Sequence, residues 1–315
     1  MAISKKVALP FIISSMTGGY AEAERINRQL AEVCLQKKIA MGVGSQRQAL
    51  ENTRYHRSFS VVRTIAPGIP IFGNLGAAQV AKLRDVSPVL RLIDLIEADG
   101  FAVHLNPLQE LLQPEGETNF RGVLDGIELL AKSLPVPLIV KEIGAGISAD
   151  VARRLMNVGV TMIDIAGSGG TSWAGIEILR RRGGERKKNR SGGTRGKNSA
   201  SSHAELFWDW GIPTVEALKS VCRLKNESPT LKVIASGGIA NGLHCAKSIA
   251  FGADFAAAAL PVLQALASGG TAGALRLLDQ WEWEFKGAMF LTGSNSIVEL
   301  QRQRLYSRVE DENKV

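Results

Sequence analysis

Short apolar runs alternate with segments of helical period along almost the whole chain. The apolar runs predict eight strands, near residues 11–16, 40–43, 70–75, 101–105, 138–142, 162–166, 232–236 and 255–260. Several of them, such as 138–140 and 162–166, are apolar at consecutive positions, which is typical of parallel strands covered on both faces. Helices are predicted between them, among others at 21–38, at 88–97 with Ser87 as N-cap and Pro88 in the first turn, and at 149–157 between Ser148 and Gly159.

Eight strand–helix units in succession favour an α/β fold, a (β/α)8 TIM barrel of roughly 250 residues plus extensions. A doubly wound open sheet has the same alternation, and periodicity alone does not separate the two. We predict a single domain over residues 1–315, because no linker-like composition interrupts the pattern before Arg180. The Gly-, Ser- and base-rich stretch 180–202 predicts a flexible insert after the sixth strand. The segment after Trp281 predicts a terminal helix that caps the barrel.

Composition narrows the class of protein further. Hydrophobic residues make up 45% of the 315 and charged residues 22%, which fits a globular protein with a large core and excludes collagen, coiled coil and disorder. The longest nearly apolar stretch, 255–263, is too short to cross a bilayer, and Pro10 interrupts the early apolar run that a signal peptide would need. Three scattered cysteines without a Cys-x-x-Cys argue against a disulfide framework or a zinc site and favour a cytoplasmic location.

The net charge of +8 is local. Nine cations and one anion lie between Arg180 and Lys197, so the rest of the chain is close to neutral. A basic footprint spread over the surface, as nucleic-acid binding requires, is missing from the sequence. We therefore expect a small-molecule substrate, with neither nucleic acid nor membrane as partner.

Glycines and polar residues gather where a barrel would carry its chemistry, at the points where strands end in loops. They follow seven of the eight strands, at 14–19, 42–47, 73–76, 104–110, 141–142, 166–172 and 236–240. A tight turn explains one such stretch, but seven at corresponding places indicate a site. Backbone N–H groups of Gly237-Gly238-Ile239 suit a phosphate, and Lys141 at a strand end suits an anion. The residues alone thus predict a phosphorylated cofactor in the barrel mouth.

Motifs at these strand ends carry a resemblance to a known family. They are Met16-Thr17-Gly18-Gly19, the run from Met41 to Arg47, the run from His104 to Gly116, Val140-Lys141-Glu142, Gly169-Gly170-Thr171-Ser172-Trp173, the run from Asp209 to Thr214, and Ala235-Ser236-Gly237-Gly238. From about Ala8 to Thr292 the chain resembles the type 2, FMN-dependent isopentenyl-diphosphate delta-isomerases, which are built on a (β/α)8 barrel.

The resemblance implies a reaction and a set of site residues. The reaction converts isopentenyl diphosphate to dimethylallyl diphosphate for isoprenoid precursor biosynthesis, with reduced FMN, Mg²⁺ and NADPH as flavin reductant, in a homo-oligomer (tetramer or octamer). The implied FMN-binding residues are Ser15, Met16, Thr17, Ser45, Asn74, Lys141, Thr171, Gly238, Ile239, Ala240, Ala259 and Leu260. The implied substrate contacts are Ser45, Gln46, Arg47, His104, Asn106 and Gln109, of which His104, Asn106 and Gln109 are catalytic. Glu110 is the implied Mg²⁺ ligand.

Three features depart from the family pattern. Family members begin some tens of residues earlier, with an Arg-Lys motif that reaches the diphosphate, whereas Lys5-Lys6 belong to a stretch just before the first strand. The family often has Arg where Ala240 and Leu260 stand, and the basic insert is atypical. Two alternatives stay open: a truncated flavin-binding homologue without isomerase activity, and another FMN-dependent barrel oxidoreductase such as a 2-hydroxy acid oxidase. The latter uses a histidine near the seventh strand, and residues 210–236 contain none.

Overall fold

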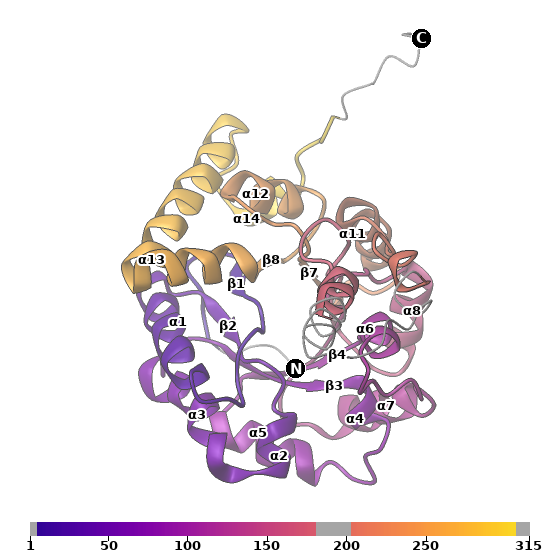
Figure 1. The fold of residues 1–315 in the computed structure, drawn as a ribbon. Coiled ribbons are helices and arrows are strands. Elements are labelled where there is room, and N and C mark those ends of the chain that lie inside the picture. Colours follow the sequence, from indigo (N-terminus) through magenta and orange to yellow (C-terminus); the bar gives the residue numbers. More distant parts are fainter. Residues whose placement is uncertain (1–4, 181–202, 307–315) are drawn as a thin grey trace.

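The computed structural model describes residues 5–180 and 203–306, and its eight strands form a closed parallel barrel in chain order (Figure 1). The strands are β1 (Phe11–Ile13), β2 (Ala40–Gly42), β3 (Ile71–Gly76), β4 (Gly100–His104), β5 (Leu138–Lys141), β6 (Met162–Asp164), β7 (Lys232–Ala235) and β8 (Phe255–Ala258). The barrel closes where Ile12 of β1 pairs with Ala257 of β8. The prediction of a single-domain (β/α)8 barrel is confirmed, and the open-sheet alternative is wrong.

Apolar residues on both faces explain why these short strands form. The barrel interior is a cluster with one residue from each strand: Ile12, Ala40, Phe72, Ala102, Ile139, Met162, Ile234 and Ala257. The alternate strand positions, such as Ile13, Val103 and Val140, join a second and larger core between the sheet and its helices. Five large side chains and three alanines fill the inner ring, so the barrel is packed rather than hollow. The only room for chemistry is at its ends.

Helices surround the barrel on all sides (Figure 1). They are α1 (Ala23–Lys37), α2 (Arg47–Glu51), α3 (His56–Ile65), α4 (Ala77–Val80), α5 (Ser87–Ile96), α6 (Pro107–Leu112), α7 (Val123–Ser133), α8 (Ala149–Asn157), α11 (Thr214–Cys222), α12 (Gly242–Ala250), α13 (Leu260–Leu291) and α14 (Ile297–Leu300), with short 3-10 turns at Thr53–Tyr55 and Arg223–Asn226. Residues 173–180 are helical as well.

The N-caps of two helices can be compared with those predicted from the sequence. The predicted start of α8 is confirmed, since the Ser148 hydroxyl accepts the Val151 N–H at 3.3 Å. The predicted cap of α5 is wrong: Val86 is the N-cap, and Ser87 is already the first helical residue. The Ser87 N–H donates to the Asp85 carboxylate at 2.8 Å, so an acid two residues upstream satisfies this helix end.

The C-terminal helix begins much earlier than predicted. Helix α13 starts at Leu260, directly after β8, and bends at Gly270, whose φ of 59° lies in the left-handed region. It packs on α1 and α12, and the Phe285 ring meets Phe11 of β1 edge to face at 5.3 Å. Helix α13 thus belongs to the outer ring, and the predicted boundary near Trp281 is wrong.

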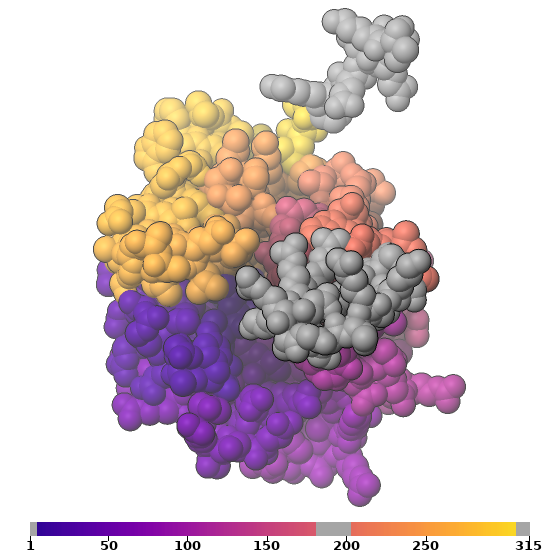
Figure 2. Space-filling model, in the orientation of Figure 1, coloured from indigo at the N-terminus to yellow at the C-terminus, as the bar shows by residue number. Residues whose placement is uncertain are grey.

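The first half of the chain forms one side of the molecule and the second half the other, as the space-filling view shows (Figure 2). The predicted flexible insert 180–202 lies outside the described residues except for Arg180. Within the described ranges, no helix has the length and apolarity that a membrane span requires.

Candidate active site

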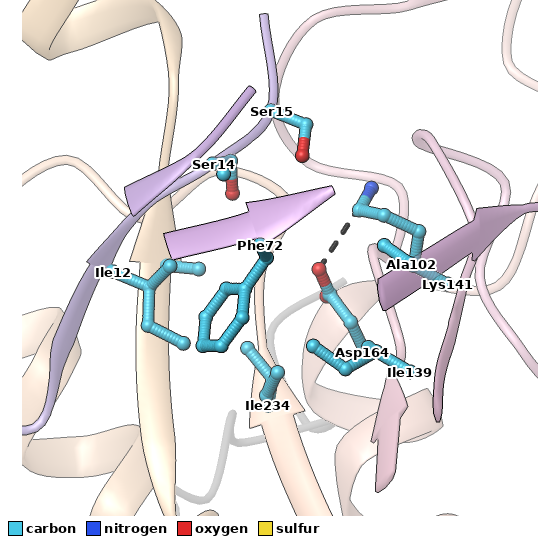
Figure 3. A pocket seen from close by; sticks show the side chains of 11 residues that line it. Ile12, Ser14, Ser15, Phe72, Ala102, Ile139, Lys141, Asp164 and Ile234 are labelled. Atoms are coloured by element: carbon cyan, nitrogen blue, oxygen red, sulfur yellow. Dashed lines mark ion pairs between the residues drawn. The ribbon is translucent and has the colours of Figure 1, made fainter. Parts of the chain in front are cut away.

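A pocket opens at the carboxyl ends of the strands (Figure 3). Its floor consists of residues from the inner ring, among them Ile12, Phe72 and Ile234, and its polar lining includes Ser14, Ser15, Lys141 and Asp164. A cation and an anion thus face each other above an apolar floor. Such a combination of a dry surface with a few convergent polar groups is typical of a small-molecule site.

Lys141 and Asp164 face each other because they end neighbouring strands in register. The Lys141 ammonium lies 3.7 Å from Asp164 Oδ2 and donates to the main-chain oxygen of Glu142 at 2.6 Å. Both side chains are buried. Asp164 therefore balances part of the positive charge of the buried Lys141. The rest of that charge faces the pocket.

His104, at the end of β4, bonds to Asn74 of β3. Its Nδ1 lies 2.9 Å from Asn74 Oδ1, and because that oxygen only accepts, Nδ1 carries the proton of the neutral ring. Burial, together with the positive charge of Lys141, lowers the pKa of His104 to about 3. His104 is therefore neutral in this structure at neutral pH, with Nε2 as its free acceptor.

This low pKa predicts a pH-dependent stability. The unfolded chain binds a proton at His104 below about pH 6.5 and the folded chain does not, so stability is lost as pH falls from about 6.5 toward 3. The expected slope is about 1.4 kcal/mol per pH unit for the ligand-free protein. Urea unfolding between pH 6 and pH 4 measures it, with His104→Asn as the comparison. Parallel stability curves for the two proteins would contradict the prediction.

Gln46 lies behind the pocket and supports Asn74. Its Oε1 accepts the Asn74 N–H at 3.0 Å and its Nε2 donates to the main-chain oxygen of Leu92 at 3.1 Å. The side chain is fully buried. A direct substrate contact, as expected from the sequence, would require this network to open, so in this structure Gln46 fixes the wall that holds His104.

A second polar cluster forms at the start of α6. Asn106 donates through Nδ2 to Glu110 Oε1 at 2.9 Å and to Gln109 Oε1 at 3.2 Å. Within residues 5–180 and 203–306, Asn106 Oδ1 is the one buried side-chain polar atom without a hydrogen-bond partner. An unpaired buried acceptor is costly, and a donor or cation from a ligand would satisfy it.

Glu110 is held firmly by its own loop. Its Oε2 accepts from Gln113 Nε2 at 2.9 Å and from the Glu117 N–H at 2.6 Å. The carboxylate is buried, and its Oε1, which accepts only from Asn106 Nδ2, keeps a lone pair for a cation. In the described part of the chain, no three His, Cys, Asp or Glu side chains come together as a metal cage. A metal at Glu110 would therefore need ligands from a substrate and water.

Glu177, in the helix 173–180, joins this cluster although sequence reading did not single it out. Its Oε1 lies 3.5 Å from Gln109 Nε2, and its Oε2 pairs with Arg180 at 3.2 Å. The residue is only 3% exposed. A glutamate in a helix of mixed polarity resembles a solvated one, so only the fold reveals that it faces Gln109.

The loops after β6 and β7 pack main chain against main chain. A Cβ on Gly237 would lie 2.0 Å from the Gly167 oxygen, and one on Gly170 would lie 2.6 Å from the Gly238 nitrogen. Thr214 joins the two loops, because its hydroxyl donates to the main-chain oxygen of Gly237 at 2.7 Å. Only glycines permit this contact.

The same loops leave main-chain donors free. Among the described residues, the N–H groups of Gly238 and Ile239 have no hydrogen-bond partner, and the Ala240 N–H reaches only His244 Nδ1 at 3.4 Å. Ala259 is the N-cap of α13 and Leu260 its first residue, without a side-chain cap. Unpaired N–H groups beside a helix start form a cradle for an anion such as phosphate.

The remaining predicted residues take mixed positions. Ser15 lines the pocket, whereas Met16 packs on the outer core and Thr17 is buried with its hydroxyl bonded to Asn27. Ser45 and Thr171 are half-buried in their loops. Arg47 is exposed and pairs with Glu51 at 3.0 Å, one turn along α2. It would have to leave this partner to reach an anionic ligand.

Comparison with known proteins agrees with this geometry. Residues 114–307 match the model of the FMN-dependent dehydrogenase family, which defines the class as FMN-dependent barrel enzymes. A flavocytochrome b2 variant with sulfite bound has the same fold, with a TM-score of 0.66 at 16% identity over 96% of this chain and 70% of its own. A mandelate oxidase variant with a monooxide FMN adduct gives 0.62 at 17% identity, over 95% and 80%.

Closer relatives narrow the class. The isopentenyl-diphosphate delta-isomerase of Chlorobaculum parvum is 46% identical over 308 residues, 96% of this chain and 82% of the relative. That of Pseudescherichia vulneris is 43% identical over 305 residues, 95% and 81%. The chain belongs to the FMN-dependent, type 2 isopentenyl-diphosphate delta-isomerase family, as its motifs predicted.

Proposed function

We propose that this chain converts isopentenyl diphosphate to dimethylallyl diphosphate, with reduced FMN and Mg²⁺. The observation that carries the proposal is the pocket of Figure 3, where Lys141 stands over an apolar floor at the strand ends. Relatives 46% identical over 96% of the chain bear the name of this activity. Moving a double bond requires a proton added at one carbon and removed from another, in a place that excludes water.

The chain's residues fit FMN. The free N–H groups of Gly238 and Ile239, with Ala240, Ala259 and Leu260 beside them, suit its phosphate, although no arginine stands at positions 240 and 260. The Lys141 ammonium suits the polar edge of a reduced ring. When bound in reduced form, FMN supplies an electron-rich face and an exchangeable proton for the alkene. We assign Ser15, Met16, Thr17, Ser45, Asn74 and Thr171 to the surrounding cofactor loops.

The diphosphate would meet the second polar cluster. Ser45, Arg47 and Gln109 carry donors for it, and the buried Gln46 holds Asn74 behind them. Glu110 and the free Asn106 Oδ1 are oxygen ligands of the kind Mg²⁺ prefers, and one carboxylate suffices when phosphate oxygens and water complete the octahedron. Neutral His104 would present its Nε2 to the ligand as a hydrogen-bond acceptor.

A product assay tests the proposal. The purified chain is loaded with FMN, reduced with NADPH or dithionite and given Mg²⁺ and isopentenyl diphosphate, and dimethylallyl diphosphate is measured by NMR. We expect product only with reduced flavin and metal. A yellow protein without product would favour the inactive flavin-binding homologue, and flavin reduction by a 2-hydroxy acid would favour the oxidoreductase. NADPH as donor, the homo-oligomer and the cytoplasmic location stay predictions.

A further inference from the structure

Asp164 is a buried acid in the pocket that neither the motifs nor the proposed chemistry uses. It is 3% exposed, ends β6 and points toward Lys141 across the pocket wall (Figure 3). An isolated carboxylate in such a place is costly, so its position calls for a purpose. Its neighbours show what it holds.

Asp164 connects three of the loops around the mouth. Its Oδ1 accepts from the Ser236 hydroxyl at 2.5 Å and from the Ala166 N–H at 3.3 Å, while its Oδ2 lies 3.7 Å from the Lys141 ammonium. Ala166 has a φ of 32°, which a residue with a Cβ rarely adopts. Asp164 thus fixes Lys141 at the end of β5, the turn after β6 and Ser236 after β7.

The charge of Asp164 acts on whatever binds beside Lys141. Reduction adds negative charge to a flavin, and a cation nearby favours that change whereas an anion opposes it. Both charges are buried in a setting where electrostatic interactions are stronger than in water. The pair Lys141–Asp164 therefore presents the pocket with a smaller positive field than Lys141 alone.

We infer that Asp164 is a positioning residue that orients Lys141 and lowers the midpoint potential of the bound flavin. The inference rests on FMN binding in this pocket, as proposed above. Asp164, at the end of β6, would thus set the midpoint potential of the flavin: its carboxylate limits how strongly Lys141 stabilises the reduced state. Ser236 has the opposite effect, since its hydroxyl donates to Asp164 and disperses part of that negative charge.

The midpoint potential of bound FMN tests this, measured by dye-coupled titration of the flavin spectrum in the full chain. Asp164→Asn keeps the shape and removes the charge, and we expect a rise equivalent to about tenfold in the reduced-to-oxidised ratio, about 30 mV for a two-electron couple. Ser236→Ala should shift the potential downward, because the carboxylate loses a donor. A merely structural role would not give shifts of opposite sign.

Asp254→Asn is the matched control. Asp254 also pairs with lysines, Lys225 at 2.6 Å and Lys232 at 3.0 Å, but at the start of β8, the other end of the barrel. We expect lower stability and an unchanged potential for this variant.

The outcomes distinguish a failure of the Asp164 inference from a failure of the proposed function. An unchanged potential in Asp164→Asn, or an equal shift in the Asp254 control, overturns the inference while FMN binding stands. If Asp164→Asn does not hold flavin, the sign of the Ser236→Ala shift decides, and an upward or absent shift overturns the inference. A wild-type chain that binds no FMN overturns the proposed function instead.

Discussion

Replacing Glu110 by Gln is expected to lower Mg²⁺-dependent turnover by about a hundredfold to a thousandfold while FMN stays bound. The variant loses the negative charge that would hold the metal. Its amide oxygen can still accept from Gln113 Nε2 and the Glu117 N–H, but its NH2 group then faces Asn106 Nδ2, so that hydrogen bond is lost. Steady-state rates against Mg²⁺ concentration, with the flavin spectrum recorded in parallel, measure both effects.

A matched control for this variant is Glu128→Gln. Glu128 is a partly exposed residue of α7 that pairs with Lys132 one turn away, and such surface pairs contribute little. Its replacement should leave turnover and metal dependence unchanged. If Glu110→Gln instead released the flavin and kept the metal dependence of the remaining activity, Glu110 would belong to the cofactor site.

Replacing Gly237 by Ala should destabilise the fold by about 2–4 kcal/mol and abolish tight FMN binding. Its φ is 97°, and a Cβ there would lie 2.0 Å from the Gly167 oxygen, which is main chain and cannot rotate away. The loops after β6 and β7 would have to separate, and the free N–H groups of Gly238 and Ile239 move with them. Urea unfolding and titration with FMN measure the two losses.

Gly68→Ala provides the comparison for Gly237→Ala. Nothing lies within 4 Å of a Cβ built at Gly68, and its φ is outside the left-handed region. We expect a neutral or slightly stabilising effect there, because alanine restricts the unfolded chain. Equal unfolding midpoints for the two variants would show that the loops around Gly237 are looser than their contacts imply.

The strands were predictable because burial on both faces leaves consecutive apolar residues. Their ends were not. The sixth strand was expected to reach Ala166, but the ladder ends at Asp164, since the positive φ of Ala166 turns the chain away. The first was expected to reach Met16 and ends at Ile13, although the Ser14 N–H still pairs with Ala258 at 2.9 Å. After the sixth strand the apolar run continues through Ile165 and Ala166, which are buried although they lie beyond the ladder.

Positions in the candidate site were predictable for residues whose motif ends a strand, and unpredictable for residues whose surroundings depend on tertiary contacts. Lys141 and His104 stand at the mouth as strand position implied. Gln46 and Arg47 belong to one motif, yet Gln46 is fully buried and Arg47 is exposed. An irregular loop has no periodicity, so its sequence does not predict which side chains point inward. Asp164 did leave a signal: an acid inside an otherwise apolar strand requires a partner.

The closed barrel also bears on which part of the chain can stand alone. The stretch matched by the broad flavoprotein class, 114–307, contains only β5 to β8, whereas β5 pairs with β4 and β8 with β1. A fragment that begins at residue 114 would leave β5 and β8 as unpaired edge strands. Such edges can pair with strands of other chains, so we expect the fragment to aggregate. The stretch that the sequence model of this class matches is thus half of a ring, and it depends on the other half to remain folded.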